Sequence, residues 1–339
     1  MPKRVVVSGY YGFGNFGDEA ILSLIINHLK NMGFEIVVLS SNPRKTSMDY
    51  FVNSIRSFDF YQVAGLLKQS DTLISGGGSL LQDVTSIKSL IYYLWVIATA
   101  LRYRKKVIIF AQGIGPINNK IAKFITGKIL KKCTYVSVRD AKSYSLLKDM
   151  GVECELLCDP IFSLEFPVKK EKGVIGVQLR DFPTLSDELL NKLARQIVKD
   201  FFDKEVRIFS FQDSIDFAVC KKFQDIIHAL NPNIKTVLKS GLSNQEVISE
   251  LSSLEYMIAM RFHAIVIALK AGVKSVAINY DAKVEKLASD SEIPLISMDA
   301  SEDFDCIFNS MKLLNENKLK SFADSRSFNW VNIDNVLKS

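Results

Sequence analysis

The sequence predicts an α/β protein with two doubly wound parallel-sheet domains and a cleft between them. Runs rich in valine and isoleucine alternate with segments of helical period along most of the 339 residues, which is typical of buried parallel strands joined by helices. A stretch at 159–172 with two prolines and a cluster of charges interrupts this alternation. Because the chain is long enough for two hydrophobic cores, we interpret the interruption as a linker.

Six strands are expected before the linker. A helix from Asp18 to Met32, ended by Gly33, separates the first two, because its apolar residues recur on one helical face. The expected strands are Val5–Ser8, Glu35–Ser40, Thr72–Ser75, Val107–Phe110, Tyr135–Val138 and Cys154–Leu157.

The most hydrophobic segment runs from Leu90 to Leu101. It is too short to span a bilayer, which takes about 20 residues, so we expect a buried helix between two strands. The basic residues that follow it, at 102, 104, 105 and 106, leave open a peripheral contact with an anionic membrane surface.

A second series of strands and helices follows the linker. The expected strands are Val174–Gln178, Val206–Phe209, Lys235–Leu238, Tyr256–Ala259, Ser275–Ile278 and Leu295–Ser297. The last segment contains Trp330 and is expected to form short helices on the outside. The predicted domains are therefore 1–165 and 166–317, with a helical segment at 318–339.

The charge, cysteine and histidine content of the chain limits the classes of partner and site that we expect. The 43 basic and 37 acidic residues leave a net charge of +6, spread along the chain, which permits an acidic substrate but is weak evidence for nucleic acid. The five cysteines form no CxxC pair, so we expect buried, reduced thiols in a cytoplasmic protein. The amino terminus leads directly into a strand, so no signal peptide is expected. No two of the three histidines have metal-ligand spacing, and no metal site is predicted.

The most informative stretch is Tyr256–Ala264, an apolar strand that runs into Arg261 and His263 just before an apolar helix. This order places both side chains at the carboxyl end of a strand and the amino end of a helix, where open α/β sheets bind anions. A permanent cation beside a titratable imidazole suits a small acidic substrate. In the structural alternative, Arg261 pairs with a carboxylate and His263 caps the helix.

The loop after the first strand contains G-x-G-x-x-G, which raises the alternative of a dinucleotide enzyme. That site also needs an acid at the end of the second strand. This chain instead has Arg44 and Lys45 there, which could suit a 2′-phosphate. Asp18 at the start of the helix would also repel a pyrophosphate. We therefore favour a backbone-lined wall of another pocket, with Gly14 and Asn15 as candidate contacts.

Other candidates follow the remaining strands. Three successive glycines let a ligand approach backbone amides, although a flexible turn is the alternative. Arg139 ends the fifth strand, and a structural pair with Asp140 is its alternative. Arg180 and Lys283 are candidate phosphate contacts or surface ion pairs. The candidates in the first domain's loops are Gly76, Gly77, Gly78, Gln82, Asp83 and Gln112.

An ordered set of motifs in the chain resembles the polysaccharide pyruvyl transferase family, most closely its bacterial cell-wall CsaB group. Ala282 departs from the family, in which proline is expected. The matching motifs are GYYGFGNFGDEA at 9–20, SGGGSLLQD at 75–83, AQGIGP at 111–116, SVRD at 137–140, CDP at 158–160, MRFHA at 260–264 and YDAKV at 280–284.

The resemblance implies a fold similar to GT-B glycosyltransferases, with an acceptor-side first domain and a donor-side second domain. It implies phosphoenolpyruvate as co-substrate and, for the CsaB group, an N-acetylmannosamine residue of a lipid-linked cell-wall precursor as acceptor. The product would be a 4,6-ketal of pyruvate. Arg139, Arg261 and His263 are the donor residues that the resemblance assigns, with Phe262 between the last two. Such an enzyme would be cytoplasmic, with a peripheral contact on the inner face of the membrane.

The chemistry of these residues agrees with that reaction. Arginines grip a carboxylate or phosphate bidentately, and His263 can act as an acid or a phosphate ligand. Asp18 could accept the proton of the attacking hydroxyl, or cap its own helix. No step needs a metal or a cofactor. A glycosyltransferase using a nucleotide sugar, and a silent sugar- or anion-binding protein, remain the alternatives; the sequence leaves the oligomeric state open.

Overall fold

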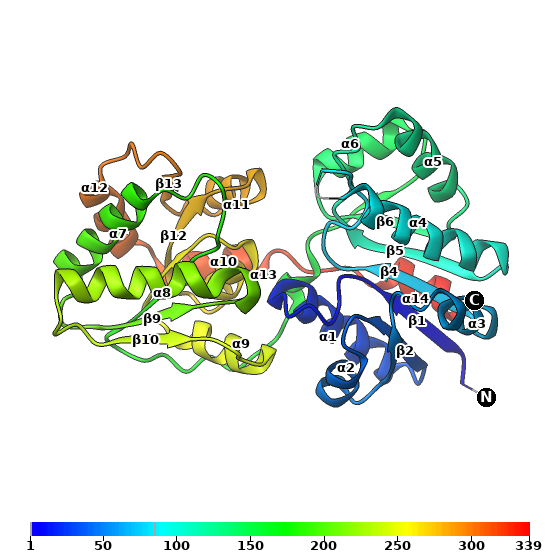
Figure 1. Ribbon diagram of the computed structural model, residues 1–339, viewed down its shortest axis with the longest axis horizontal. Coiled ribbons are helices and arrows are strands. Elements are labelled where there is room, and N and C mark those ends of the chain that lie inside the picture. The colour runs from blue at the N-terminus through cyan, green and yellow to red at the C-terminus, as the bar shows by residue number, and fades with distance from the viewer. Residues whose placement is uncertain (1, 85) are drawn as a thin grey trace. The chain divides into compact units, whose positions relative to one another are not determined.

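The computed structural model describes residues 2–84 and 86–339. The chain divides into two compact units, each built around its own parallel sheet (Figure 1). The first unit comprises Met1–Ser163 with Ser327–Ser339, and the second comprises Leu164–Arg326. The prediction of two doubly wound α/β domains is confirmed.

The described part of the first unit contains a seven-stranded parallel sheet in the order β3-β2-β1-β4-β5-β6-β7. β1 pairs with β2 on one side and β4 on the other, so the strand order reverses at β1 and β4. Open sheets of this kind bind ligands at the carboxyl ends of the strands beside such a reversal. The strands are β1 Arg4–Ser8, β2 Glu35–Ser40, β3 Asn53–Arg56, β4 Thr72–Gly76, β5 Lys106–Gln112, β6 Tyr135–Val138 and β7 Glu155–Leu156.

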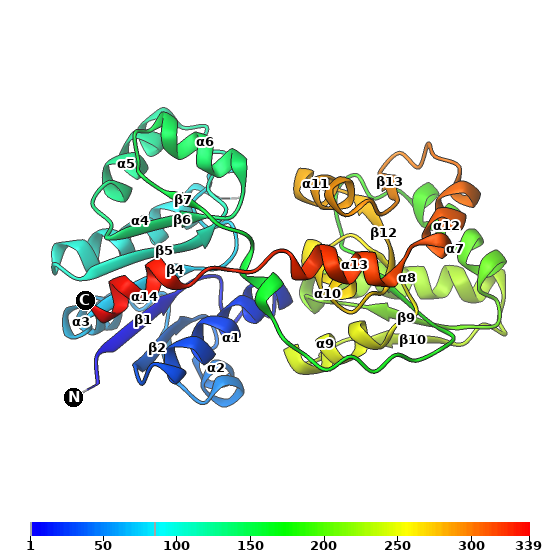
Figure 2. The same cartoon turned by 180° about the vertical axis from the view of Figure 1, so that it is seen from behind.

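Alternate residues of each strand enter two separate cores, as the pleat of a strand requires. Val6 packs with residues of α3 to α6, whereas Val5 and Val7 pack with α1 and α14. Figure 2 shows α14 lying along the sheet beside β1 and β4. The helices of this unit are α1 Phe16–Asn31, α2 Pro43–Tyr50, α3 Phe60–Gln69, α4 Ile87–Arg102, α5 Lys120–Leu130, α6 Ala141–Asp149 and α14 Val331–Lys338.

Two expectations for the first unit are settled by these elements. The segment Leu90–Leu101 lies in α4, between β4 and β5, and seven of its helix's residues are buried, which confirms the prediction of a buried helix. β3 was not predicted, because its sequence Asn-Ser-Ile-Arg contains a single apolar residue. It forms at the edge of the sheet by pairing with β2.

The second unit contains, within the described residues, a six-stranded parallel sheet in the order β10-β9-β8-β11-β12-β13. Its order reverses at β8 and β11, which pair in register from Tyr256 opposite Ile175. The strands are β8 Val174–Gln178, β9 Glu205–Phe209, β10 Thr236–Lys239, β11 Tyr256–Ala259, β12 Lys274–Asn279 and β13 Leu295–Ser297.

Helices cover both faces of the second sheet. α7, α8 and α12 close a core over one face, while α10 contacts α9 and α13. The helices are α7 Asp187–Asp200, α8 Asp213–Leu230, α9 Asn244–Ser253, α10 Phe262–Lys270, α11 Ala282–Ser291, α12 Phe304–Leu313 and α13 Glu316–Asp324. Among the described residues, no helix is both long and apolar enough to cross a membrane.

The ends of the predicted domains differ in detail from this division. The stretch 159–172 begins with a short 3₁₀ helix, Pro160–Ser163, whose Ile161 is fully buried in the first unit. The predicted terminal segment 318–339 is divided: α13 belongs to the second unit, whereas α14 belongs to the first. Ile333 and Leu337 of α14 are fully buried there, so this helix completes a core rather than covering an exterior surface.

The cysteines are free, as expected, but the prediction that they are buried is wrong for most of them. Cys220 is fully buried, and Cys306 is exposed. The other three are partly buried. Burial raises the pKa of the Cys220 thiol to about 12, which leaves it protonated and inert at neutral pH.

Candidate functional site

The predicted residues of the first unit gather where β1, β4, β5 and β6 end. β1 leads into the loop before α1, β4 into the three glycines, β5 into Gln112 and β6 into Arg139. Neighbouring parallel strands end at the same edge of a sheet, so these segments share the edge beside the strand-order reversal.

The glycines after β4 are needed for close contacts inside the protein. Gly77 and Gly78 have positive φ angles of 84° and 60°, which glycine alone adopts at little cost. A Cβ on Gly78 would lie 2.3 Å from Oδ1 of Asp18, and one on Gly77 would lie 3.1 Å from Oη of Tyr11. Tyr11 in turn donates a 2.6 Å hydrogen bond to the carbonyl of Gly76.

Asp18 is buried in the first turn of α1, with 5% of its surface exposed. Its Oδ2 accepts a 2.6 Å hydrogen bond from Nδ2 of Asn15, the residue that precedes the helix. Burial is the main cause that raises the pKa of Tyr11 and of Tyr93, and the negative charge of Asp18 adds to both. A carboxylate and two protonated phenols therefore occur together at this edge.

Glu19, which the sequence did not single out, is also part of this edge. Its Oε1 accepts a 2.7 Å hydrogen bond from the backbone N–H of Gly12, and its Oε2 accepts a 2.8 Å bond from Tyr50. Burial raises the pKa of Glu19, although these two hydrogen bonds oppose the rise. Glu19 thereby holds the glycine loop against α1.

Arg139 is fixed by a buried aspartate from beyond β7. Its Nη1 donates a 2.6 Å hydrogen bond to Oδ2 of Asp159, and its Nη2 lies 3.4 Å from Oγ of Ser79. The side chains of Arg139 and Asp159 are 9% and 4% exposed. Asp140, the partner considered from the sequence, instead caps α6 through the backbone N–H of Ser143.

Other loop candidates of the first unit have varied surroundings. Gln112 is fully buried and donates a 2.9 Å hydrogen bond to Ser75. Asp83 accepts hydrogen bonds from the backbone N–H groups of Asn118 and Asn119, which lower its pKa. Gln82 is partly buried, and Gly14 is exposed.

In the second unit Arg261 lies where the sequence predicted, between the carboxyl end of β11 and the amino end of α10, with only Met260 between it and the strand. Its backbone N–H donates a 2.8 Å hydrogen bond to Oε1 of Gln178. Its Nε lies 3.1 Å from Oδ2 of Asp216, and its Nη2 lies 2.9 and 2.7 Å from the two oxygens. Because Asp216 is fully buried, the structure contains the carboxylate pairing that was the alternative reading of Arg261.

The remaining donor candidates follow neighbouring strands of the same sheet. His263 is partly buried, and its ring meets that of Phe262 edge-on at 5.4 Å. Arg180 follows β8, and its guanidinium lies 5.6 Å from the ring centroid of Tyr280, within cation–π range. Lys283 is in the first turn of α11, where its backbone N–H bonds to the capping Asp281.

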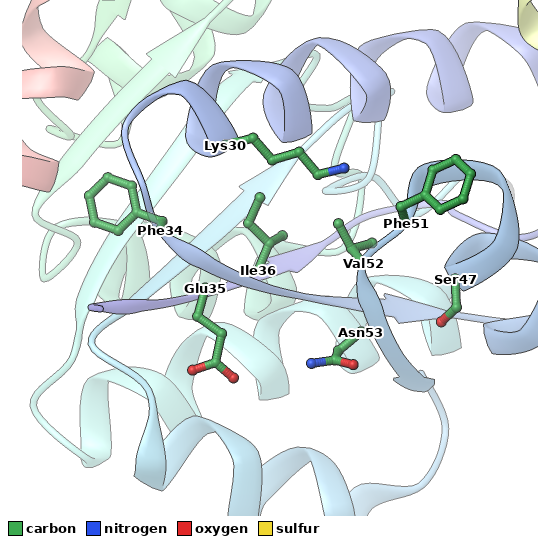
Figure 3. A pocket seen from close by; sticks show the side chains of 8 residues that line it. All are labelled: Lys30, Phe34, Glu35, Ile36, Ser47, Phe51, Val52 and Asn53. Carbon is green, nitrogen blue, oxygen red and sulfur yellow. The ribbon is translucent and has the colours of Figure 1, made fainter. Parts of the chain in front are cut away.

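The predicted residues thus form two groups, one at the carboxyl edge of each sheet. Asp18, Arg139 and the glycine loops belong to the first unit, whereas Arg261, His263 and the other donor candidates belong to the second. Two pockets among the described residues, one where α1 ends and one where β6 begins, contain none of them. Figure 3 shows one of these pockets, of about 450 Å³, where α1 ends and β2 and β3 begin.

The lining of that pocket does not favour catalysis. Lys30 reaches over it from α1 to the carbonyl of Tyr50, and Phe51 borders it with a largely exposed ring.

In the described ranges, no cluster of three histidine, cysteine or carboxylate side chains has a geometry that could hold a metal ion.

The comparisons with known proteins agree with this architecture. The family model for polysaccharide pyruvyl transferase matches residues 15–282. No curated protein matches the chain. A putative UDP-N-acetylglucosamine 2-epimerase from Listeria monocytogenes has a similar structure, with a TM-score of 0.62 and 11% identity over 100% of this chain and 97% of the other.

Two further solved structures have the same fold. Anabaena Alr3699/HepE in complex with UDP-glucose has a TM-score of 0.65 at 10% identity, over 99% of this chain and 98% of the other. MurG of Acinetobacter baumannii has a TM-score of 0.58 at 11% identity, with both chains fully covered. These similarities identify the fold as GT-B-like.

Proposed function

Because this chain belongs to the polysaccharide pyruvyl transferase family, a family of enzymes that transfer pyruvyl groups to polysaccharide, we propose that its donor is phosphoenolpyruvate. We further propose that it belongs to the CsaB group and forms a pyruvate ketal on N-acetylmannosamine of a lipid-linked cell-wall precursor. The main support for the proposal is the position of Arg261 and His263 at the amino end of α10. Both residues lie within the range 15–282 that the family model matches.

Phosphoenolpyruvate carries a carboxylate and a phosphate on three carbons, so its site needs several donors of positive charge. Arg139, Arg261 and His263 are the proposed donor residues. A helix amino terminus adds a favourable field for an anion, and no acidic residue occurs in the first turn of α10. Arg180 and Lys283, each after a neighbouring strand, are the proposed additional phosphate contacts.

Buried Asp159 supports the assignment of Arg139 because it holds the guanidinium in a fixed orientation. A guanidinium has five N–H donors in a rigid plane, and the hydrogen bonds from Arg139 to Asp159 and Ser79 involve only two of its nitrogens. Among the described residues the buried Nε of Arg139 has no hydrogen-bond partner. An arginine held this way is already oriented for an oxyanion, which lowers the entropic cost of binding.

The proposed reaction balances without a cofactor. The methylene carbon of phosphoenolpyruvate gains a proton, and a sugar hydroxyl attacks the electrophilic C2. The C2–O bond to phosphate breaks, and a second hydroxyl closes the ketal ring. Of the two hydroxyl protons, one replaces the proton delivered to the methylene carbon and the other leaves with phosphate. His263 is the proposed acid and Asp18 the proposed base.

The test is a mixture of the protein, phosphoenolpyruvate and a lipid-linked acceptor that ends in N-acetylmannosamine. Mass spectrometry should detect the acceptor with one pyruvate ketal, in an amount equal to the phosphate released. Turnover of a UDP-sugar in place of phosphoenolpyruvate would instead identify a glycosyltransferase. Binding of either donor with no turnover of any acceptor would identify a binding protein.

Lysine is a better replacement than alanine at the two arginines. Arg261→Ala would leave Asp216 buried without its partner, so a loss of activity could reflect unfolding. Arg261→Lys keeps a charge beside Asp216 but removes the planar fork. We expect this variant to fold and to lose ketal formation by about 100-fold or more, which corresponds to about 3 kcal/mol of lost transition-state binding. Arg102→Lys, an exposed matched control, should keep full activity.

A further inference from the structure

The amino-terminal turns of α4 and α5 expose apolar side chains. Ile121, Phe124 and Ile125 of α5 are 72%, 61% and 44% exposed. Ile87 and Ile91 of α4 are 41% and 59% exposed. An isolated exposed apolar residue needs no explanation, but several together mark an interaction surface.

α5 has two opposite faces. Ile121, Phe124 and Ile125 are spaced by three and four residues, so they form one stripe along the helix. The side that packs on the unit carries Thr126 and Leu130. The apolar stripe therefore faces away from the core and is not needed to hold α5 in place.

Asp83 joins the two helix starts. Its carboxylate accepts hydrogen bonds of 2.9 and 2.8 Å from the backbone N–H groups of Asn118 and Asn119, directly before α5. Val84, which follows Asp83 and lies three residues before Ile87, the first residue of α4, is 62% exposed. α4 and α5 also contact each other (Figure 1), and we group the exposed apolar residues of both helices as one surface. We call this surface, made of Val84, Ile87, Ile91, Ile121, Phe124 and Ile125, the α4–α5 face.

Apart from the Asp83 carboxylate, which is held by the backbone N–H groups of Asn118 and Asn119, the charge around the α4–α5 face is positive. The segments 84–91 and 117–132 contain six lysines and no aspartate or glutamate. Lys88, Lys120 and Lys128 are exposed, and Nζ of Lys128 lies 4.4 Å from the ring centroid of Phe124. Apolar residues bordered by lysines with long flexible stems fit the boundary between anionic headgroups and acyl chains.

We propose that the α4–α5 face docks this protein on the surface of an anionic lipid bilayer. α4 follows β4 and α5 follows β5, so both helices start at the edge of the sheet that carries the glycine loops. If the acceptor is lipid-linked, which is taken from the proposed function, docking here brings its headgroup toward those loops. This location differs from the basic cluster at 102–106 considered from the sequence, where Lys106 instead bonds to the carbonyl of Val336.

The test is co-sedimentation of the full chain with vesicles of phosphatidylglycerol and phosphatidylcholine, compared with vesicles of phosphatidylcholine alone. We expect binding to the anionic vesicles, and a loss of at least about tenfold in the variant Ile121→Gln/Phe124→Gln/Ile125→Gln. Glutamine favours helix and the replaced side chains are exposed, so the variant should fold. Lys120→Gln should weaken binding by about fivefold.

Two matched control variants distinguish binding by the α4–α5 face from non-specific binding by other exposed apolar or basic residues. Phe202→Gln/Leu313→Gln removes two exposed apolar residues of the second unit, and Arg102→Gln/Lys105→Gln removes charge from the other basic cluster. Both should bind vesicles as the natural chain does. The assay contains no substrate, so its outcome is independent of the proposed reaction.

Three outcomes would overturn the docking proposal. The natural chain could stay in the supernatant with anionic vesicles, or the triple glutamine variant could bind as tightly as the natural chain. In the third, sedimentation velocity without lipid would show a dimer that the triple variant dissociates, with no vesicle binding, which would make the α4–α5 face a contact between copies of this chain.

Discussion

Removing either member of the pair Arg261–Asp216 should destabilise the second unit strongly. Asp216 is fully buried and accepts hydrogen bonds from two nitrogens of Arg261 at 2.7–3.1 Å. Loss of one partner leaves a buried charge uncompensated, which typically costs about 3–5 kcal/mol. Asp216 also accepts a 3.1 Å bond from the backbone N–H of Gln212, so we expect Asp216→Ala to be the more costly change, by about 1 kcal/mol.

The double variant Asp216→Ala/Arg261→Met separates this cause from general damage to the core. It contains no orphaned charge, so its cost should be smaller than the sum of the single variants by about 2–3 kcal/mol. Additive costs, or single-variant costs below about 1 kcal/mol, would refute the idea that a buried ion pair orients Arg261.

The assay is urea denaturation followed by two signals. Far-ultraviolet circular dichroism reports both units, whereas both tryptophans, Trp95 and Trp330, lie in the first unit. Tryptophan fluorescence therefore reports the first unit separately. The destabilisation predicted for the Arg261 and Asp216 variants should appear in the dichroism transition. Variants of the matched pair Arg139–Asp159 in the first unit should instead shift the fluorescence transition.

Two further predictions concern the first unit. Gly78→Ala should cost at least about 1 kcal/mol more than Gly14→Ala, because both sites have positive φ but only the Cβ at Gly78 would meet Asp18, at 2.3 Å; equal urea midpoints would contradict the close approach. The pKa of Glu19 is raised above its ordinary value of 4.5 in the folded protein, so the native state holds this proton more tightly than the unfolded state. The carboxyl therefore stabilises the natural protein at low pH, and this contribution is lost as the pH rises through the folded pKa. Because glutamine does not titrate, Glu19→Gln should gain stability relative to the natural protein as the pH rises above 4.5; an unfolding free-energy difference between the two proteins that stays constant with pH would exclude this.

The sequence predicted most strands because burial on both faces leaves continuous apolar runs. Tyr135–Val138, Tyr256–Ala259 and Val174–Gln178 have the predicted bounds. β3 was missed because an edge strand needs only one partner, and its hydrogen bonds come from β2 rather than from any pattern of its own. The order of the strands was not readable, because it depends on pairing between segments far apart in the chain.

The position of the candidate residues could be predicted, but their partners could not. Alternation of strands and helices is enough to place Arg139 and Arg261 at strand ends. Asp159 and Asp216 lie 20 and 45 residues away along the chain from the arginines that they pair with. Nothing in the local sequence distinguishes such an aspartate from a helix cap, because the pairing exists only in the folded unit.

The roles of the three glycines illustrate the same limit. Gly76, Gly77 and Gly78 were interpreted as places where a ligand touches the backbone. In the structure, Tyr11 and Asp18 occupy the space beside the last two. The absence of side chains at these glycines is therefore explained by packing within the unit, whatever ligand binds nearby.

The proposed donor and its residues are tested most directly by the release of phosphate from phosphoenolpyruvate, measured with and without the N-acetylmannosamine acceptor. We predict that release requires the acceptor and falls by about 100-fold or more in Arg139→Lys, Arg261→Lys and His263→Gln, each folded by circular dichroism. Undiminished release in all three variants would contradict the assignment of these residues. No release by the natural chain from phosphoenolpyruvate, together with turnover of a UDP-sugar, would contradict the proposed donor.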